Sequence, residues 1–184
     1  MSGVSIEAQA LQDCEVAIIG GGPAGLMAAQ VLAEAGGQVH VFDAMASVGR
    51  KFLLAGRGGL NLTHAEDADA FEGRYGQRRE AISAALGALD GRGVRRWAHD
   101  LGIDTFVGSS GRVFPSDMKA APLLRAWLQR LRHPQPGVAV QFHMRHRWLG
   151  WDAAGCLRFA SPQGERRACA KAVLLALGGG SWAR

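Results

Sequence analysis

Residues 16–43, VAIIGGGPAGLMAAQVLAEAGGQVHVFD, constrain the fold of this chain more than any other stretch. The continuous apolar run VAII is typical of a parallel strand that is covered on both faces. Gly20, Gly22 and Gly25 follow it with the spacing G-x-G-x-x-G, and PAGLMAAQVLAEA then has the pattern of a helix that a glycine pair ends. VHVF predicts a second strand, which Asp43 closes. Strand, glycines, helix, strand and acid in this order predict a dinucleotide-binding βαβ unit.

Each position of the glycine motif has a distinct chemical role. Gly20 permits the tight turn, Gly22 lets a pyrophosphate approach the backbone, and Gly25 lets the helix pack closely on the strand. Pro23, followed by Ala24, falls in the first turn of the predicted helix. Proline is tolerated there because it lacks only an N–H that would have no partner within the helix. The start of the helix offers N–H donors and a partial positive charge, so we expect residues 20 and 22–25 to bind the phosphates.

The second strand and the helix spacing narrow the choice of dinucleotide. Asp43, with Ala44 after it, lies where a carboxylate accepts hydrogen bonds from ribose hydroxyls, which disfavours the 2′-phosphate of NADP. Ala29 and Gly36 follow Gly25 at intervals that resemble the fingerprint of FAD-binding flavoproteins with two dinucleotide-binding domains. FAD is therefore the cofactor that we expect.

A second glycine-rich stretch follows the βαβ unit. Arg50 and Lys51 supply cations close to the ribose site, which suits a pyrophosphate. The loop AGRGGLN comes next, and the backbone N–H groups around Gly58, Gly59 and Asn61 suit the ribityl-phosphate part of a long cofactor.

Together these motifs resemble the BaiN-type family of bacterial FAD-dependent oxidoreductases. Family members carry GRK and then a loop of the form S-G-G-G-R-C-N-x-T. The matching positions here are Gly49, Arg50, Lys51, Gly56, Gly58, Asn61 and Thr63. The chain departs at Arg57, Gly59 and Leu60, where the family has Gly, Arg and Cys. The arginine has thus moved two places earlier, and the thiol is absent.

The resemblance implies a fold, a cofactor and a reaction. The fold is an α/β, Rossmann-like, three-layer β/β/α FAD-binding domain. FAD would reduce an activated carbon–carbon double bond of a small-molecule substrate by hydride from flavin N5, and no residue is assigned as catalytic. Because the chain has no second G-x-G-x-x-G, NAD(P)H as electron donor would use a transient site.

The resemblance also assigns two cofactor contacts near the end of the chain. The stretch ALGG, made of Ala176, Leu177, Gly178 and Gly179, corresponds to the family's ATGG turn beside the FAD. Trp148 would lie near the adenine. The match runs from Val16 to Arg184 but covers only the first part of longer family members. We therefore expect a FAD domain that lacks its final strand and helix and is inactive alone.

The remaining sequence predicts the internal organisation of the chain. We expect a tail over 1–14 and the incomplete FAD-binding domain over 15–184. Within it, 64–135 is a mainly helical excursion, with short helices at REAISAALGAL and GVRRWAHDLG and an amphipathic helix capped by Ser116. Its apolar stripe consists of Leu123, Leu124, Trp127, Leu128 and Leu131. A β-meander is expected over 138–170, with VAVQFHMRHRW as a single alternating strand.

Composition excludes several classes of protein. The three cysteines are scattered without a Cys-x-x-Cys pair, which argues against a disulfide framework or a zinc site. His143 and His146 would point to opposite faces of one strand, so no metal site is expected. The start lacks the features of a signal peptide and no stretch is long enough to span a bilayer, so we expect a reducing, cytoplasmic setting without a membrane partner.

The net charge of +5 favours anionic partners and leaves two alternatives to an oxidoreductase. One is an RNA-modifying flavoprotein, although no aromatic and basic strand platform for nucleic acid is evident. The other is a non-catalytic nucleotide-binding module.

Overall fold

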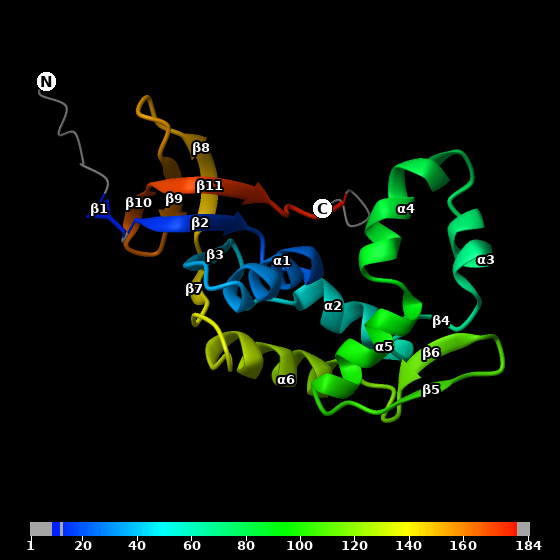
Figure 1. The fold of residues 1–184 in the computed structure, drawn as a ribbon. Helices are drawn as coiled ribbons and strands as arrows, with labels where there is room; N and C mark the ends of the chain where they lie inside the picture. Colours follow the sequence, from blue (N-terminus) through cyan, green and yellow to red (C-terminus); the bar gives the residue numbers. More distant parts are fainter. Residues whose placement is uncertain (1–8, 12, 180–184) are drawn as a thin grey trace, which may run out of the picture. The chain divides into compact units, whose positions relative to one another are not determined.

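The computed structural model describes residues 9–11 and 13–179, and a parallel sheet is its first main element (Figure 1). The chain divides into two compact units, one within residues 1–51 and 129–184 and the other made of residues 52–128. The parallel sheet lies in the first unit. Its strands are β2 (Cys14–Ile19), β3 (Val39–Asp43), β7 (Gln141–Met144) and β11 (Ala170–Leu175), in the order β11-β2-β3-β7. Since all three pairings are parallel, the carboxyl ends of the strands meet at one edge.

Two layers cover this sheet. Helix α1 (Pro23–Glu34) packs along β2 and β3 through buried Leu26, Ala29 and Ala33. An antiparallel meander of β8 (Arg147–Trp151), β9 (Leu157–Ser161) and β10 (Gly164–Ala168) covers the other face, and β1 (Gln9–Ala10) pairs with β10. The predicted Rossmann-like α/β class is therefore confirmed.

The core between the parallel sheet and the meander is apolar and aromatic. Ala17, Ile19 and Phe42 from the parallel sheet pack against Leu157 and Phe159 from β9. The rings of Phe42 and Phe159 stack with centroids 4.3 Å apart and planes 14° apart. Both side chains are fully buried, and removing each from water contributes about 2 kcal/mol to stability. This packing fixes the end of β3, where Asp43 lies.

The second unit is mainly helical and carries a small antiparallel sheet of order β4-β6-β5. Its elements are the end of α2 (Arg50–Ala55), η1 (Gly56–Gly58), β4 (Thr63–His64), α3 (Ala68–Gly73), η2 (Gly76–Arg78), α4 (Arg79–Ala88), α5 (Gly91–Asp100), β5 (Thr105–Val107), β6 (Arg112–Pro115) and most of α6 (Ala120–Arg132). Trp97 and Trp127 meet edge to face with ring centroids 4.8 Å apart. The helices α4 and α5 coincide with the two short helices expected there.

The amphipathic helix forms, but its predicted start is wrong. Leu123, Leu124, Trp127 and Leu131 are buried, as the apolar stripe predicts. The helix begins at Ala120, and Ser116 instead lies at the end of β6, where its backbone N–H donates to the Asp104 carbonyl. Within the stretch GRVFP, residues 112–115 form strand β6, in which Val113 pairs with both Thr63 and Val107.

The single strand expected over 138–148 is also wrong. Its first half forms β7, which pairs with β3 in the parallel sheet, and its second half begins β8 in the meander. Arg145 breaks the strand because its backbone is left-handed, with φ of 59°. The meander therefore spans 147–168 rather than 138–170. His143 and His146 do not point apart on one strand, since their ring centroids lie 5.7 Å from each other.

The cysteines depart from expectation as well. Cys156 and Cys169 form a disulfide, and Cys14 is a buried free thiol. The two partners are brought together by the antiparallel pairing of β9 with β10, which places the residue before β9 beside the residue after β10.

Neither a membrane span nor a metal cluster is evident in residues 9–11 and 13–179. The helices in these ranges are too short or too polar to traverse a bilayer. The same residues contain no group of three or more His, Cys, Asp or Glu side chains arranged to hold a metal ion.

Candidate nucleotide-binding site

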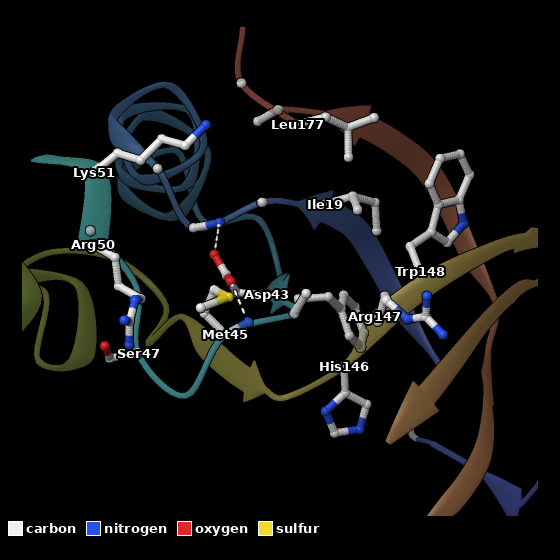
Figure 2. Close-up of a pocket in the computed structure, with 18 of the residues that line it drawn as sticks. Ile19, Asp43, Met45, Ser47, Arg50, Lys51, His146, Arg147, Trp148 and Leu177 are labelled. Carbon is white, nitrogen blue, oxygen red and sulfur yellow. Dashed lines mark hydrogen bonds between the residues drawn. The ribbon is translucent and has the colours of Figure 1, made fainter. Parts of the chain in front are cut away.

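A pocket of about 360 Å³ opens at the carboxyl edge of the parallel sheet (Figure 2). Its walls come from the β2–α1 turn, the end of β3, the start of α2, the start of β8 and the segment after β11. The lining residues are Ile19, Gly20, Gly21, Gly22, Pro23, Phe42, Asp43, Ala44, Met45, Ser47, Gly49, Arg50, Lys51, His146, Arg147, Trp148, Ala176, Leu177 and Gly178. In parallel α/β sheets this edge is where ligands bind.

The three motif glycines have the different surroundings that their predicted roles require. Gly20 has a φ of 111°, and a Cβ there would lie 2.3 Å from the Ala176 carbonyl oxygen. A Cβ on Gly25 would lie 2.0 Å from the Gly20 carbonyl oxygen. At Gly22, by contrast, a Cβ would meet no atom of the described chain within 4 Å. Gly20 and Gly25 therefore serve the turn itself, whereas Gly22 leaves its backbone open to the pocket.

The N-terminus of α1, where a helix carries a partial positive charge, lies at Gly22. Gly22 is the N-cap and makes no side-chain cap, and Pro23 occupies the first turn, which contains no acidic residue. The first N–H groups of a helix lack partners within it, and the aligned peptide dipoles add a partial positive charge. This arrangement suits a phosphate group.

Asp43 fixes the loop opposite that helix start. One carboxylate oxygen accepts from the Gly21 N–H and the other from the Met45 N–H, each at 2.8 Å (Figure 2). A carboxylate oxygen has two lone pairs, so each still has capacity for a further donor such as a hydroxyl. Gly21 was not singled out from the sequence, although a Cβ there would come within 2.3 Å of Val48 Cγ1.

Two cations line the same pocket from the start of α2. Arg50 and Lys51 are its first residues, and both are among the lining side chains. A Cβ on Gly178 would lie 3.8 Å from Lys51 Nζ, which places that ammonium beside the segment after β11. Both cationic residues therefore border the same pocket as the glycine turn.

The corner between β7 and β8 forms another wall of the pocket, and the sequence predicts only Trp148 of its lining residues. The backbone N–H groups of Arg145 and His146 donate to the Met45 and Asp43 carbonyls, both at 2.9 Å. These bonds hold Trp148 at the pocket and bring His146 and Arg147 with it. The indole Nε1 of Trp148 is buried and has no hydrogen-bond partner among the described residues.

A histidine cluster lies behind this wall. His143 Nε2 is 3.2 Å from His40 Nδ1, and the His143 ring stacks on Phe42 at 4.5 Å. Burial, with smaller effects of His40 and His146, lowers the pKa of His143 to about 4. Burial also lowers the pKa of His40. Both imidazoles are therefore neutral near pH 7 and extend the aromatic core.

The pocket gathers most of the residues proposed from the sequence. Those that line it are Gly20, Gly22, Pro23, Asp43, Ala44, Arg50, Lys51, Trp148, Ala176, Leu177 and Gly178. Ala24 and Gly179 are next to lining residues in the chain, and Gly25 is two positions from Pro23, but none of the three is among the lining residues. Gly58, Gly59 and Asn61 belong to the second unit, so the structure does not place them against it. Met45, Ser47, His146 and Arg147 are additional lining residues whose only sequence signal is proximity to Asp43, Arg50 and Trp148.

Solved structures of oxidoreductases share this fold. The 3-ketosteroid-Δ4-(5α)-dehydrogenase from Rhodococcus jostii RHA1 matches with a TM-score of 0.64 and 15% identity over 97% of this chain and 48% of its own. A flavocytochrome c3 fumarate reductase matches with a TM-score of 0.54 and 16% identity over 93% of this chain and 34% of its own. L-proline dehydrogenase from P. horikoshii matches with a TM-score of 0.53 and 16% identity over 94% of this chain and 24% of its own.

The chain thus spans less than half the length of each of these three proteins. No curated protein matches its sequence. A family model described as the HI0933-like protein Rossmann domain matches residues 14–184, which is nearly the whole chain. The chain therefore belongs to the HI0933-like Rossmann domain family.

Proposed function

We propose that the pocket binds the ADP half of FAD and that the chain is the FAD-binding portion of a flavin-dependent oxidoreductase. The observation that carries this proposal is the open backbone at Gly22, set at the start of α1 and beside the Asp43 carboxylate. A pyrophosphate needs close backbone approach and N–H donors, and a ribose needs a carboxylate acceptor. Gly22 and Asp43 meet these needs within one pocket.

The chemistry of the other lining groups fits the same ligand. Arg50 and Lys51 would neutralise the pyrophosphate, and Lys51 lies beside the segment that carries Gly178. Trp148 offers an aromatic face for the adenine. The free lone pairs of Asp43 are available to ribose hydroxyls.

For the reaction we propose reduction of an activated carbon–carbon double bond in a small-molecule substrate, as in the BaiN-type family. The support is the sequence resemblance around Gly49–Lys51 and the loop that follows it. The bound flavin would supply the hydride from its N5 atom, while the residues of this chain bind and orient the cofactor. NAD(P)H is the proposed electron donor.

The binding claim is tested by titrating FAD into the purified chain and following flavin absorption and fluorescence. We expect saturable FAD binding that ADP displaces competitively, because both ligands share the pyrophosphate and adenosine groups. FMN, which lacks the adenosine half, should bind far more weakly. FAD that does not bind, or that FMN displaces as well as ADP does, would refute the placement of the ADP half in this pocket.

A further inference from the structure

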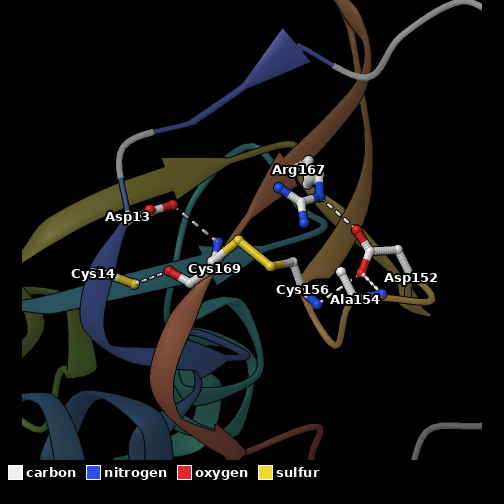
Figure 3. Close-up of a disulfide and its surroundings, with 7 residues drawn as sticks. All are labelled: Asp13, Cys14, Asp152, Ala154, Cys156, Arg167 and Cys169. Atoms are coloured by element: carbon white, nitrogen blue, oxygen red, sulfur yellow. Dashed lines mark hydrogen bonds and ion pairs between the residues drawn. A yellow bond between two sulfur atoms is a disulfide. The ribbon is translucent and has the colours of Figure 1, made fainter.

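The Cys156–Cys169 disulfide joins two parts of the chain that lead directly to the nucleotide pocket (Figure 3). Cys156 immediately precedes β9, at the end of the turn that follows β8, and Cys169 lies between β10 and β11. The opposite end of β8 carries Arg147 and Trp148, and β11 runs into Ala176 at the pocket. The disulfide therefore joins the end of the turn that follows β8 to the residue that precedes β11, and neither cysteine lines the pocket.

Strand β8 lies at one edge of the meander sheet. It is the last strand of the order β1-β10-β9-β8, so β9 is its one ladder partner within the described residues. That ladder is interrupted by a register shift between Trp148 and Gly150. At the end of β8, Asp152 accepts from the backbone N–H groups of Ala154 and Cys156 and pairs with Arg167 (Figure 3). The disulfide is the covalent part of this anchorage.

The two cysteine residues differ in exposure. Cys156 is buried, whereas Cys169 is half-buried and lines a groove with Asp13, Glu15 and Lys171. Cys169 is therefore the more exposed residue of the pair. Cys14 is close by, with its Sγ 3.9 Å from the Cys169 carbonyl oxygen. Burial, together with the charge of Asp13, raises the pKa of Cys14 to about 11, so this thiol stays protonated and is a poor internal nucleophile.

We propose that Cys156 and Cys169 form a reversible thiol/disulfide site, reduced by small or protein dithiols, whose oxidised state tightens the nucleotide pocket. One thiolate of the dithiol bonds to Cys169 Sγ, the S–S bond breaks, and the electron pair leaves with Cys156 Sγ. The second thiol of the reductant then releases Cys169. In total two electrons and two protons pass to the cysteines, and the dithiol becomes a disulfide.

The redox state of the two cysteines would affect nucleotide affinity by changing the fraction of molecules whose pocket is able to bind. Without the disulfide, the turn after β8 loses its covalent link to the start of β11, and β8 opens locally more often. Apparent affinity falls in proportion to the fraction of molecules with the wall formed by Trp148 in place. This inference rests on the proposed function, because the affinity in question is for FAD or ADP.

The test compares the oxidised protein with the protein reduced by dithiothreitol under argon. Thiol titration should find one free thiol in the oxidised form and three in the reduced form. The dissociation constants for FAD and ADP should rise about threefold or more on reduction. The variant Cys156→Ser/Cys169→Ser should bind as the reduced protein does and ignore the reductant, whereas Cys14→Ala should keep the full response.

Hydrogen exchange of β8 separates failure of this proposal from failure of the proposed function. Amides of Arg147–Trp151 should exchange faster in the reduced protein, whether or not FAD binds. If neither form binds FAD or ADP, the proposed function is wrong, while faster exchange would still support the redox coupling. Three free thiols after treatment with oxidised glutathione would overturn the proposal. Equal exchange and equal affinities in the two forms would also overturn it.

Discussion

Replacing Gly22 by alanine tests whether this glycine is required for ligand binding rather than for folding. Gly22 has φ of −80° and ψ of −179°, which alanine adopts without strain, and its Cβ would meet no described atom within 4 Å. Alanine is a poorer N-cap than glycine but restricts the unfolded chain, and these effects oppose each other. The free energy of unfolding without ligand should therefore change by less than about 0.5 kcal/mol.

The same methyl group would occupy space that the proposed function assigns to a pyrophosphate. Loss of one hydrogen bond between a backbone N–H and a charged phosphate costs about 1.5–3 kcal/mol, which corresponds to a dissociation constant roughly 10- to 150-fold higher. We expect Gly22→Ala to weaken FAD and ADP binding by this factor. Urea denaturation measures the stability, and flavin fluorescence with ADP competition measures the affinities.

Gly25→Ala is the matched control. Its Cβ would lie 2.0 Å from the Gly20 carbonyl oxygen, so helix and strand must separate. We expect this variant to lose about 1–3 kcal/mol of stability without any ligand present. Gly22 has no ligand-specific role if Gly22→Ala binds FAD as tightly as the parent, or if it is destabilised as much as Gly25→Ala.

Three other substitutions test the site and its supports. Asp43→Ala leaves the Gly21 and Met45 N–H groups without their acceptor, so urea denaturation should show a loss of about 2 kcal/mol before any effect on ligand binding is considered. The pKa of His143 is about 4 in the folded protein, against an ordinary value of 6.5. As the pH falls below 6.5, His143 therefore takes up a proton in the unfolded protein before it does so in the folded protein. Stability should hence decline from pH 6.5 toward 4, and less steeply in His143→Phe; parallel pH profiles would contradict this. Arg145→Gly should raise the melting temperature because φ is 59° there, with a gain of up to about 1 kcal/mol, and an unchanged or lower value would argue against backbone strain.

The central βαβ unit was predictable because its signal is local. The run VAII, the spacing of Gly20, Gly22 and Gly25, and the acid at position 43 are each determined by neighbours in the chain. The resulting predictions for the sheet, α1 and the glycine turn correspond to the structure. The lining roles of Arg50 and Lys51 were accessible for the same reason, since only a short loop separates them from Asp43.

The features that sequence missed depend on tertiary contacts. Alternating apolar residues over 138–148 look like one strand, and only pairing with β3 on one side and β9 on the other divides it at Arg145. The disulfide has no local motif, because its partners are 13 residues apart and meet through the β9–β10 hairpin. Gly21 has no distinguishing signal within a run of three glycines, although Val48 packs against it.

The most direct test of the central claim is a titration of the isotope-labelled chain with ADP and then FAD, followed by backbone amide NMR. We expect both ligands to shift the amides of the Gly20–Gly25 turn, with the Gly22 amide among the most affected, together with those of Arg50, Lys51 and Trp148. Gly22→Ala should diminish these shifts at equal ligand concentration. Shifts that leave the Gly20–Gly25 turn unaffected, or no shifts at saturating ADP and FAD, would contradict the claim.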